Sequence, residues 1–169
     1  QQLSRAEVID GLRQRREAER PDDDLFAEFL AELVDEVPND DLEDRALDDL
    51  FRVAATHYDF GRVRAPHEPA IEVVETGSGA VVLLVTDDMP FLIDTMLMVL
   101  QRRHLELELL VHPVLAVERD SAGELTSLDA VDPHRSGQLV EAWTQLQIDA
   151  DPGPATDALV EELRVVIAD

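Results

Sequence analysis

The stretch IEVVETGSGAVVLLVTDDMPFLIDTMLMVLQRR, residues 71–103, decides the fold. It opens with two runs of β-branched and other apolar residues, 71–76 and 80–86, which the turn Gly77-Ser78-Gly79 separates. Runs of this kind joined by a short glycine-containing turn are typical of a β-hairpin. We therefore predict two antiparallel strands at the start of this stretch.

A helix is predicted to follow the hairpin. Pro90 is compatible with a first helical turn, and Asp88 is a suitable capping residue. The apolar residues that supply a wide helical face before Arg103 are Leu92, Ile93, Met96, Leu97, Val99 and Leu100. The stretch as a whole thus predicts a strand–strand–helix unit.

Strict alternation dominates residues 105–117. The odd positions are all apolar: Leu105, Leu107, Leu109, Val111, Pro113, Leu115 and Val117. A period of two predicts one long strand whose odd face is the core face. Because Pro113 cannot donate a hydrogen bond to a neighbouring strand, we expect an edge or a bulge at that position.

The remaining sequence predicts a turn at 120–124, a short strand, a strand over 142–148 and a last helix that Pro152 and Pro154 open. From residue 80 onward the order is βαββα, which is a ferredoxin-like arrangement without its last strand. We therefore predict an α+β fold, an antiparallel sheet with helices on one face. Residues 71–75 are expected to fill the vacant position beside the first strand.

The first 64 residues predict a helical segment, and residues 65–169 the α+β domain. Apolar residues at helical spacing over 22–37 form one stripe: Leu25, Phe26, Phe29, Leu30, Leu33, Val34 and Val37. The acidic run 22–24 is expected to cap that helix. A second helix is predicted from Asp40, with Glu43 completing a capping box, to Gly61, and a weaker one over 3–20. We expect these helices to serve packing or docking.

Composition excludes several partners. The chain of 169 residues has 38 acidic and 14 basic residues, a net charge of −24, so phosphate backbones and anionic membranes are repelled. No apolar run approaches the length of a membrane span. The absence of cysteine fits a reducing cytoplasm. We expect no nucleic acid and no membrane as partner. Because the chain opens on Gln1 and stops inside a predicted helix, we also expect a segment of a longer protein.

The ionisable residues suggest neither a metal site nor a catalytic site. The histidines are scattered over different predicted elements: His57, His67, His104, His112 and His134. None forms a ligand pair at metal-binding spacing, so we expect no metal. Asp87, Asp88 and Asp94 are close in sequence, but no acid, base or nucleophile is spaced with them. We assign them to capping and loop roles and predict no catalytic residue.

Two ordered motifs resemble a known family. They are Thr86–Met96 (TDDMPFLIDTM) and Leu109–Asp120 (LLVHPVLAVERD), and Trp143–Asp149 (WTQLQID) is similar to the strand that follows them. Together they resemble the N-terminal, ACT-like region of the large NAD-specific glutamate dehydrogenases of bacteria. The resemblance implies a homo-oligomeric cytoplasmic parent enzyme that converts L-glutamate and NAD to 2-oxoglutarate, ammonium and NADH.

The chemistry of that parent is expected to reside outside this chain. A dinucleotide site needs a glycine-rich turn between a strand and a helix, whereas Gly77 and Gly79 join two strands. The family also uses a catalytic lysine, and this chain has no lysine. We therefore expect no cofactor here and NAD in the parent, and partners among the other domains or subunits of the same enzyme.

Two roles remain open, architectural and effector-sensing. ACT domains hold amino acids at a strand-to-helix turn with the motif Asp-x-Pro-Gly-Leu, and here Phe91 replaces the glycine. The candidate effector loop comprises Asp87, Asp88, Met89, Pro90, Phe91 and Asp94. The candidate interface is the even face of the long strand, namely Leu110, His112, Val114 and Ala116. The sheet face away from the helices needs a cover, from the N-terminal helices, a second copy or a neighbouring domain.

Overall fold

The computed structural model describes residues 3–39, 41, 46–76, 79–149 and 152–168. Its helices are α1 (Arg5–Glu19), α2 (Asp24–Asp35), α4 (Leu47–Gly61), α5 (Leu92–Arg102) and α6 (Thr156–Ala168), with a short 3-10 turn η1 (Gly153–Ala155) before the last. The strands are β1 (Ala70–Thr76), β2 (Gly79–Asp87), β3 (Leu107–Val111), β4 (Val114–Arg119), β5 (Leu125–Ala130) and β6 (Leu139–Ile148).

The strands form one antiparallel sheet in the order β1-β2-β6-β4-β5, with β3 also paired to β6. The predicted hairpin is confirmed, with Val73 opposite Val82. β2 then pairs with β6, Leu84 opposite Thr144. The predicted ferredoxin-like arrangement is therefore confirmed, and β1 occupies the position beside β2 that a last strand would otherwise fill.

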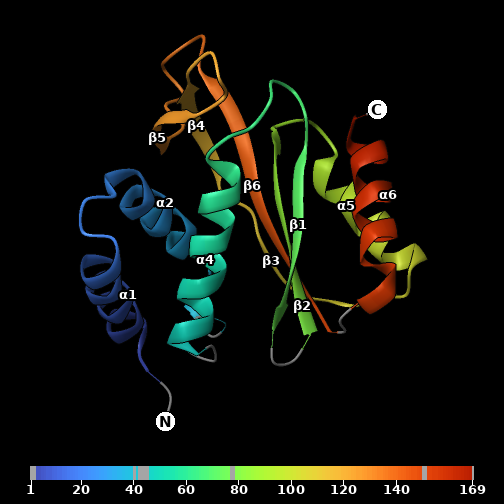
Figure 1. The fold of residues 1–169 in the computed structure, drawn as a ribbon, viewed down its shortest axis with the longest axis horizontal. Helices are drawn as coiled ribbons and strands as arrows, with labels where there is room; N and C mark the ends of the chain where they lie inside the picture. The colour runs from blue at the N-terminus through green and yellow to red at the C-terminus, as the bar shows by residue number, and fades with distance from the viewer. Residues whose placement is uncertain (1–2, 40, 42–45, 77–78, 150–151, 169) are drawn as a thin grey trace.

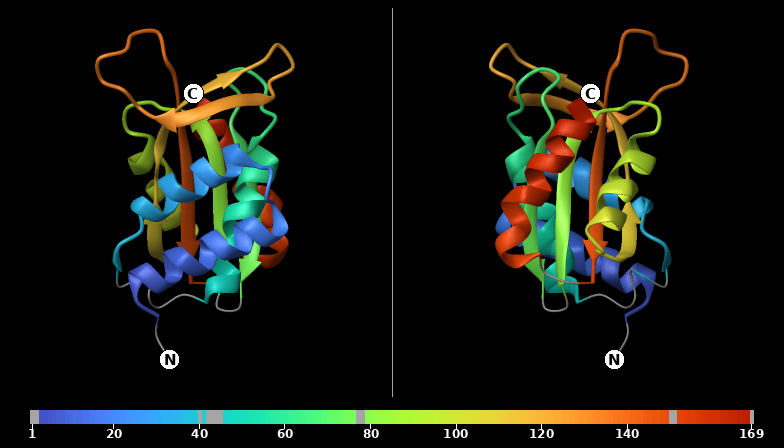
Figure 2. Two further views of the ribbon diagram at one scale, coloured as in Figure 1. Left: turned by 90° about the vertical axis from the view of Figure 1, so that its left-hand side faces the viewer. Right: turned by 90° about the vertical axis from the view of Figure 1, so that its right-hand side faces the viewer.

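Helices cover both faces of this sheet (Figure 1). The helices predicted with the α+β domain, α5 and α6, lie on one face, and α1, α2 and α4 lie on the other (Figure 2). β2 serves both layers, because Val82 and Leu84 pack with α5 and α6 while Val81 and Leu83 pack with Val53 of α4. The cover that the second face needs is thus the N-terminal helical segment.

The long strand predicted over 105–117 is divided in two. β3 and β4 lie end to end along β6, with Leu110 opposite Leu146 and Val114 opposite Ala142. The interruption at His112 and Pro113 agrees with the expectation for this proline. β4 is not an edge strand, however, because β5 pairs with its other side.

The odd residues of this strand face the core, as predicted, but not all on the same side of the sheet. The register shifts between Leu107 and Leu109, so Leu107 packs on the α5–α6 side. The odd residues Leu109 to Val117 instead face the N-terminal helices. An extra residue in a strand reverses the side of every residue beyond it, and the alternation in the sequence carried no mark of the bulge.

The start of α5 also differs from the prediction. Its N-cap is Phe91, with φ 63° and no side-chain cap, so Asp88 does not cap the helix and Pro90 precedes its first turn. The cause lies in the sheet, since Asp88 N still donates to Val140 O at 3.2 Å. The chain therefore turns only after Asp88, through a left-handed residue at position 91.

Among the N-terminal helices, the helix predicted over 3–20 is α1, and the acidic cap of α2 is confirmed at Asp23, whose carboxylate accepts from Phe26 N at 3.1 Å. The prediction of a continuous helix from Asp40 to Gly61 was wrong, because Ala46 is extended and α4 begins at Leu47. The capping box of Asp40 and Glu43 lies outside the described residues, as do Gly77 and Ser78.

Candidate functional site

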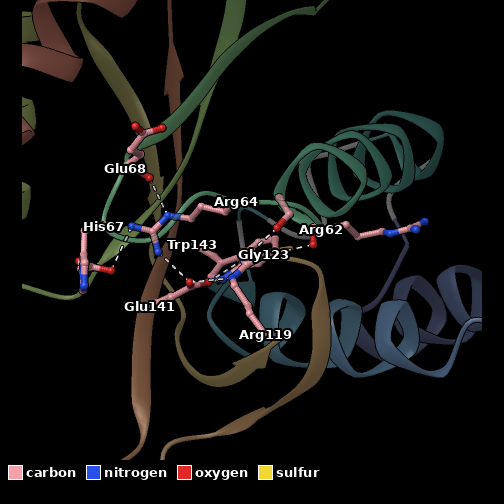
Figure 3. Close-up of polar contacts among 10 residues, drawn as sticks. Arg62, Arg64, His67, Glu68, Arg119, Gly123, Glu141 and Trp143 are labelled. Atoms are coloured by element: carbon pink, nitrogen blue, oxygen red, sulfur yellow. Dashed lines mark hydrogen bonds and ion pairs between the residues drawn. The ribbon is translucent and has the colours of Figure 1, made fainter. Parts of the chain in front are cut away.

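A buried ion cluster joins the end of the helical segment to the sheet (Figure 3). Arg64 Nη1 donates to Glu141 Oε2 at 2.7 Å. Arg119 grips the same carboxylate with two bonds, Nε to Oε2 at 3.0 Å and Nη2 to Oε1 at 2.9 Å. The side chains of Arg64, Glu141 and Arg119 are only 3%, 0% and 7% exposed. Two cations thus share one buried anion, which neutralises only one of their charges.

The second carboxylate of the cluster is Asp87, the first residue of the candidate effector loop. Arg64 Nη2 donates to its Oδ1 at 3.0 Å, and His67 Nδ1 lies 2.8 Å from its Oδ2. Burial alone would raise the pKa of Asp87, but the hydrogen bonds from His67 and Arg64 outweigh burial and lower it. Asp87 is therefore committed to the cluster as an anion.

Arg119 also donates hydrogen bonds to backbone carbonyl groups of neighbouring segments. It donates to Gly61 O at 2.9 Å and Gly123 O at 2.8 Å, at the end of α4 and in the β4–β5 turn. The indole Nε1 of Trp143 donates to Glu141 Oε1 at 3.3 Å. The cluster thus ties α4, β2, β6 and the β4–β5 hairpin at one point.

The rest of the candidate effector loop is more open. Asp94 lies in the first turn of α5, and Met89 is partly buried against the α5–α6 core. Phe91 is 78% exposed, so its ring points to solvent and does not fill the loop. Its φ of 63° lies in the left-handed region that glycine prefers. The turn therefore keeps a glycine conformation with a phenylalanine.

The candidate interface residues are half-buried beside that loop. Leu110 packs with the α5–α6 core, and His112 Nδ1 lies 2.9 Å from Thr144 Oγ1. Burial lowers the pKa of His112, although Asp88 and Glu36 act in the opposite direction. Val114 and Ala116 are likewise half-buried. The even face is thus partly covered by this chain.

A polar residue that the sequence prediction gave no role is His57 of α4. Its Nε2 lies 2.9 Å from Leu84 O, and its ring packs against Phe29, Phe60 and Trp143. Complete burial lowers its pKa to about 4. The alternation Glu141, Trp143, Gln145, Gln147 along β6 was the available signal, because a tryptophan on a polar face indicates that something covers that face.

Among the described residues no group of three or more histidine, cysteine, aspartate or glutamate side chains is arranged to hold a metal ion. No described helix has both the length and the apolar character that crossing a bilayer requires.

The topology and the strand-to-helix loop define an ACT-like α+β domain with an added helical layer. The family model described as glutamate dehydrogenase, ACT1 domain, matches residues 29–163, and the chain belongs to this family. The resemblance predicted from the two motifs is therefore confirmed.

A curated relative points the same way. The chain is 27% identical, over 182 aligned positions, to the NAD-specific glutamate dehydrogenase of Halomonas elongata. The alignment covers 98% of this chain and 11% of that enzyme. The chain thus spans about a tenth of the length of the relative.

Proposed function

We propose that this chain is a non-catalytic domain of a large NAD-specific glutamate dehydrogenase, serving contacts between domains or subunits. The parent would oxidise L-glutamate to 2-oxoglutarate and ammonium with NAD, as a cytoplasmic homo-oligomer, with the NAD site elsewhere in its chain. Support comes from membership of the ACT1 family and from similarity to the NAD-specific glutamate dehydrogenase of Halomonas elongata, of which the alignment covers 11%.

The observation that carries the contact role is Phe91. A left-handed backbone costs a non-glycine residue about 1–2 kcal/mol, and a side chain that is 78% exposed recovers little of it by burial. Backbone strain that no contact within the chain compensates is typical of functional positions. Phe91 therefore suits insertion into a partner.

Met98 extends the same surface. It is 47% exposed and lies in α5, seven residues beyond the N-cap Phe91 and about 10 Å farther along the helix axis. We name these two residues the Phe91–Met98 stripe. Because helices of this chain already cover both sheet faces, the outer surface of α5 is a better docking surface than the sheet.

The test of docking uses the chain and the remainder of its parent polypeptide, produced separately and mixed. We expect a complex on gel filtration, with affinity lowered at least about tenfold in the double variant Phe91→Gly/Met98→Gln. The matched control is Val165→Gln on α6, an exposed apolar residue outside the stripe. Absence of a complex, or equal binding by the double variant, would contradict the proposal.

Catalysis is tested directly. The chain mixed with L-glutamate and NAD is expected to produce no NADH at 340 nm, because no lysine and no dinucleotide-binding turn are present. Turnover that co-purifies with the chain through several columns would overturn the non-catalytic assignment.

A second candidate function is effector sensing at the loop 87–94. The glycine-like backbone of Phe91 and the lack of a side-chain cap at that residue favour it, because the first N–H groups of a helix attract anions. The neighbouring carboxylate of Asp88 disfavours an anionic ligand. We expect an amino-acid dissociation constant no tighter than about 1 mM. Calorimetry showing micromolar binding that changes at Asp88 or Phe91 abolish would make sensing the leading role.

A further inference from the structure

A cavity of about 190 Å³ lies between the N-terminal helices and the sheet, on the face opposite α5. Its walls are apolar and include Leu33 of α2, Leu50 and Val53 of α4 and Val111 of β3. The sheet contributes three polar lining residues: Thr76, Gln145 and Gln147. Ala46 and Asp49, at the start of α4, are exposed lining residues, so solvent reaches the cavity there.

Gln147 presents an acceptor without a donor. Its amide nitrogen donates to Glu108 Oε2 at 3.1 Å, which fixes the orientation of the carboxamide because a carboxylate only accepts. Its Oε1 is buried and has no hydrogen-bond partner in the described structure. A buried acceptor left unpaired costs about 1–3 kcal/mol, so this oxygen favours a donor supplied from outside.

Gln145 is oriented in the same way by His57. The low pKa of His57 keeps its ring neutral near pH 7, and Nε2 carries the proton because it faces Leu84 O. Nδ1 is therefore an acceptor, and the amide nitrogen of Gln145 donates to it at 3.1 Å. Because its amide nitrogen donates to His57, the carboxamide oxygen of Gln145 is the group that can accept from a ligand.

Thr76 adds a third oxygen. Its Oγ1 is buried and likewise lacks a partner in the described structure. No arginine or histidine is among the described residues that line the cavity, and the acidic side chain among them is Asp49. The lining therefore suits hydrogen-bond donors and repels carboxylates.

We propose that this cavity binds a small amphipathic molecule with an apolar body and a hydrogen-bond-donating amine or hydroxyl head. The volume fits a body of the size of benzene, for which a cavity of about 150 Å³ suffices. The head would donate to the oxygens of Gln147, Gln145 and Thr76. The site is separate from the Phe91–Met98 stripe, and this inference does not rest on the proposed docking function.

Four probes of one size test the proposal on the 169-residue chain by NMR titration: benzylamine, benzyl alcohol, toluene and benzoate. We expect benzylamine or benzyl alcohol to bind saturably, with a dissociation constant of about 1 mM or tighter. The backbone amides of Thr76, Gln145 and Gln147 should shift, and NOEs should join the probe ring to the methyl groups of Val53 and Val111. If neither donor probe binds there, or if toluene or benzoate binds equally well, the proposal is wrong.

A variant identifies the acceptor. Gln147→Met keeps most of the side-chain volume and removes the oxygen, so affinity for the donor probes should fall at least about fivefold while that for toluene does not fall. Gln101→Met, at an exposed position of α5 on the other side of the sheet, is the matched control. Unchanged affinity in Gln147→Met would overturn the assigned contact. If that variant does not fold, the NOEs on the unaltered chain decide the matter.

Discussion

The guanidinium of Arg64 donates to the carboxylate of Glu141 at 2.7 Å, and both side chains are buried. Because Arg119 binds the same carboxylate, Glu141→Gln would leave the buried Arg119 without its carboxylate and Arg64 with Asp87 alone. We expect this change to lower the free energy of unfolding by about 3–5 kcal/mol. Urea denaturation measures the loss.

The control for Glu141 is Glu124→Gln. Glu124 pairs with Arg62 at 3.6 Å on the surface, where an ion pair contributes about 0–1 kcal/mol. If Glu141→Gln lowers the free energy of unfolding by less than about 1 kcal/mol, the cluster is solvated and contributes no more to stability than this surface pair.

The burial of His57 should make the free energy of unfolding decrease as the pH falls. The unfolded chain binds a proton at this imidazole below pH 6.5, whereas the folded chain does so only near pH 4. Stability is therefore lost as the pH falls from about 6.5 to 4, by about 3 kcal/mol in all. Asp87, whose pKa is lowered, adds a loss of the same sign only at more acidic pH.

Comparing the stability of the unaltered chain with that of His57→Gln at each pH separates the effect of His57 from the titration of the many acidic residues. His57→Gln is expected to be less stable at pH 7 but to lose less stability between pH 6.5 and 4. Denaturation at several pH values gives both curves, and parallel curves would show that His57 does not titrate as its burial requires.

Gly61 is expected to tolerate no side chain. A Cβ there would lie 2.5 Å from Cη2 and 2.6 Å from Cζ3 of Trp143, and the packed indole cannot retreat. Gly61→Ala should lower the free energy of unfolding by about 1–3 kcal/mol. Gly11→Ala is the control, since its Cβ would meet the movable end of Leu47 and alanine favours the helix by about 0.5–1 kcal/mol. Equal effects at both sites would contradict the close approach to Trp143.

Phe91→Gly should stabilise the chain. It relieves a left-handed backbone at φ 63° and removes a ring that is largely exposed, for a net gain of about 0.5–1 kcal/mol after the entropy of glycine is counted. Phe91→Ala keeps a Cβ and should bring no gain. Thermal melts compare the three, and if alanine stabilises as much as glycine, the backbone carries no strain.

The hairpin and the helix after it were predictable because their signals are local. The first residues of α5 were not, since Asp88 N stays bonded to Val140, about fifty positions later in the sequence. The bulge after Leu107 was equally unpredictable, because the odd residues before and after it are all apolar. The even-face residues therefore lie toward α5, and their interface role stays a prediction.

The buried cluster and the cavity escaped prediction for another reason. Glu141, Gln145 and Gln147 follow each other on one face of β6, a pattern that resembles a solvated strand. The structure buries that face under α2 and α4, helices at least eighty residues earlier in the sequence. Only long-range packing turns these polar residues into a buried network, and Trp143 was the single local sign of it.

The position of β1 beside β2 also bears on how the chain folds. Their paired residues are 3 positions apart at Thr76 and Gly79 and 15 apart at Ala70 and Val85, whereas β2 and β6 pair residues 54 to 68 apart. Closing the short loop costs less entropy, so the hairpin can form first and nucleate the sheet before distant strands arrive. Val73→Ala should then slow refolding in stopped flow, whereas Leu163→Ala in α6 should chiefly speed unfolding. A last strand at the end of the chain would instead have joined β2 only through contacts between distant parts of the sequence.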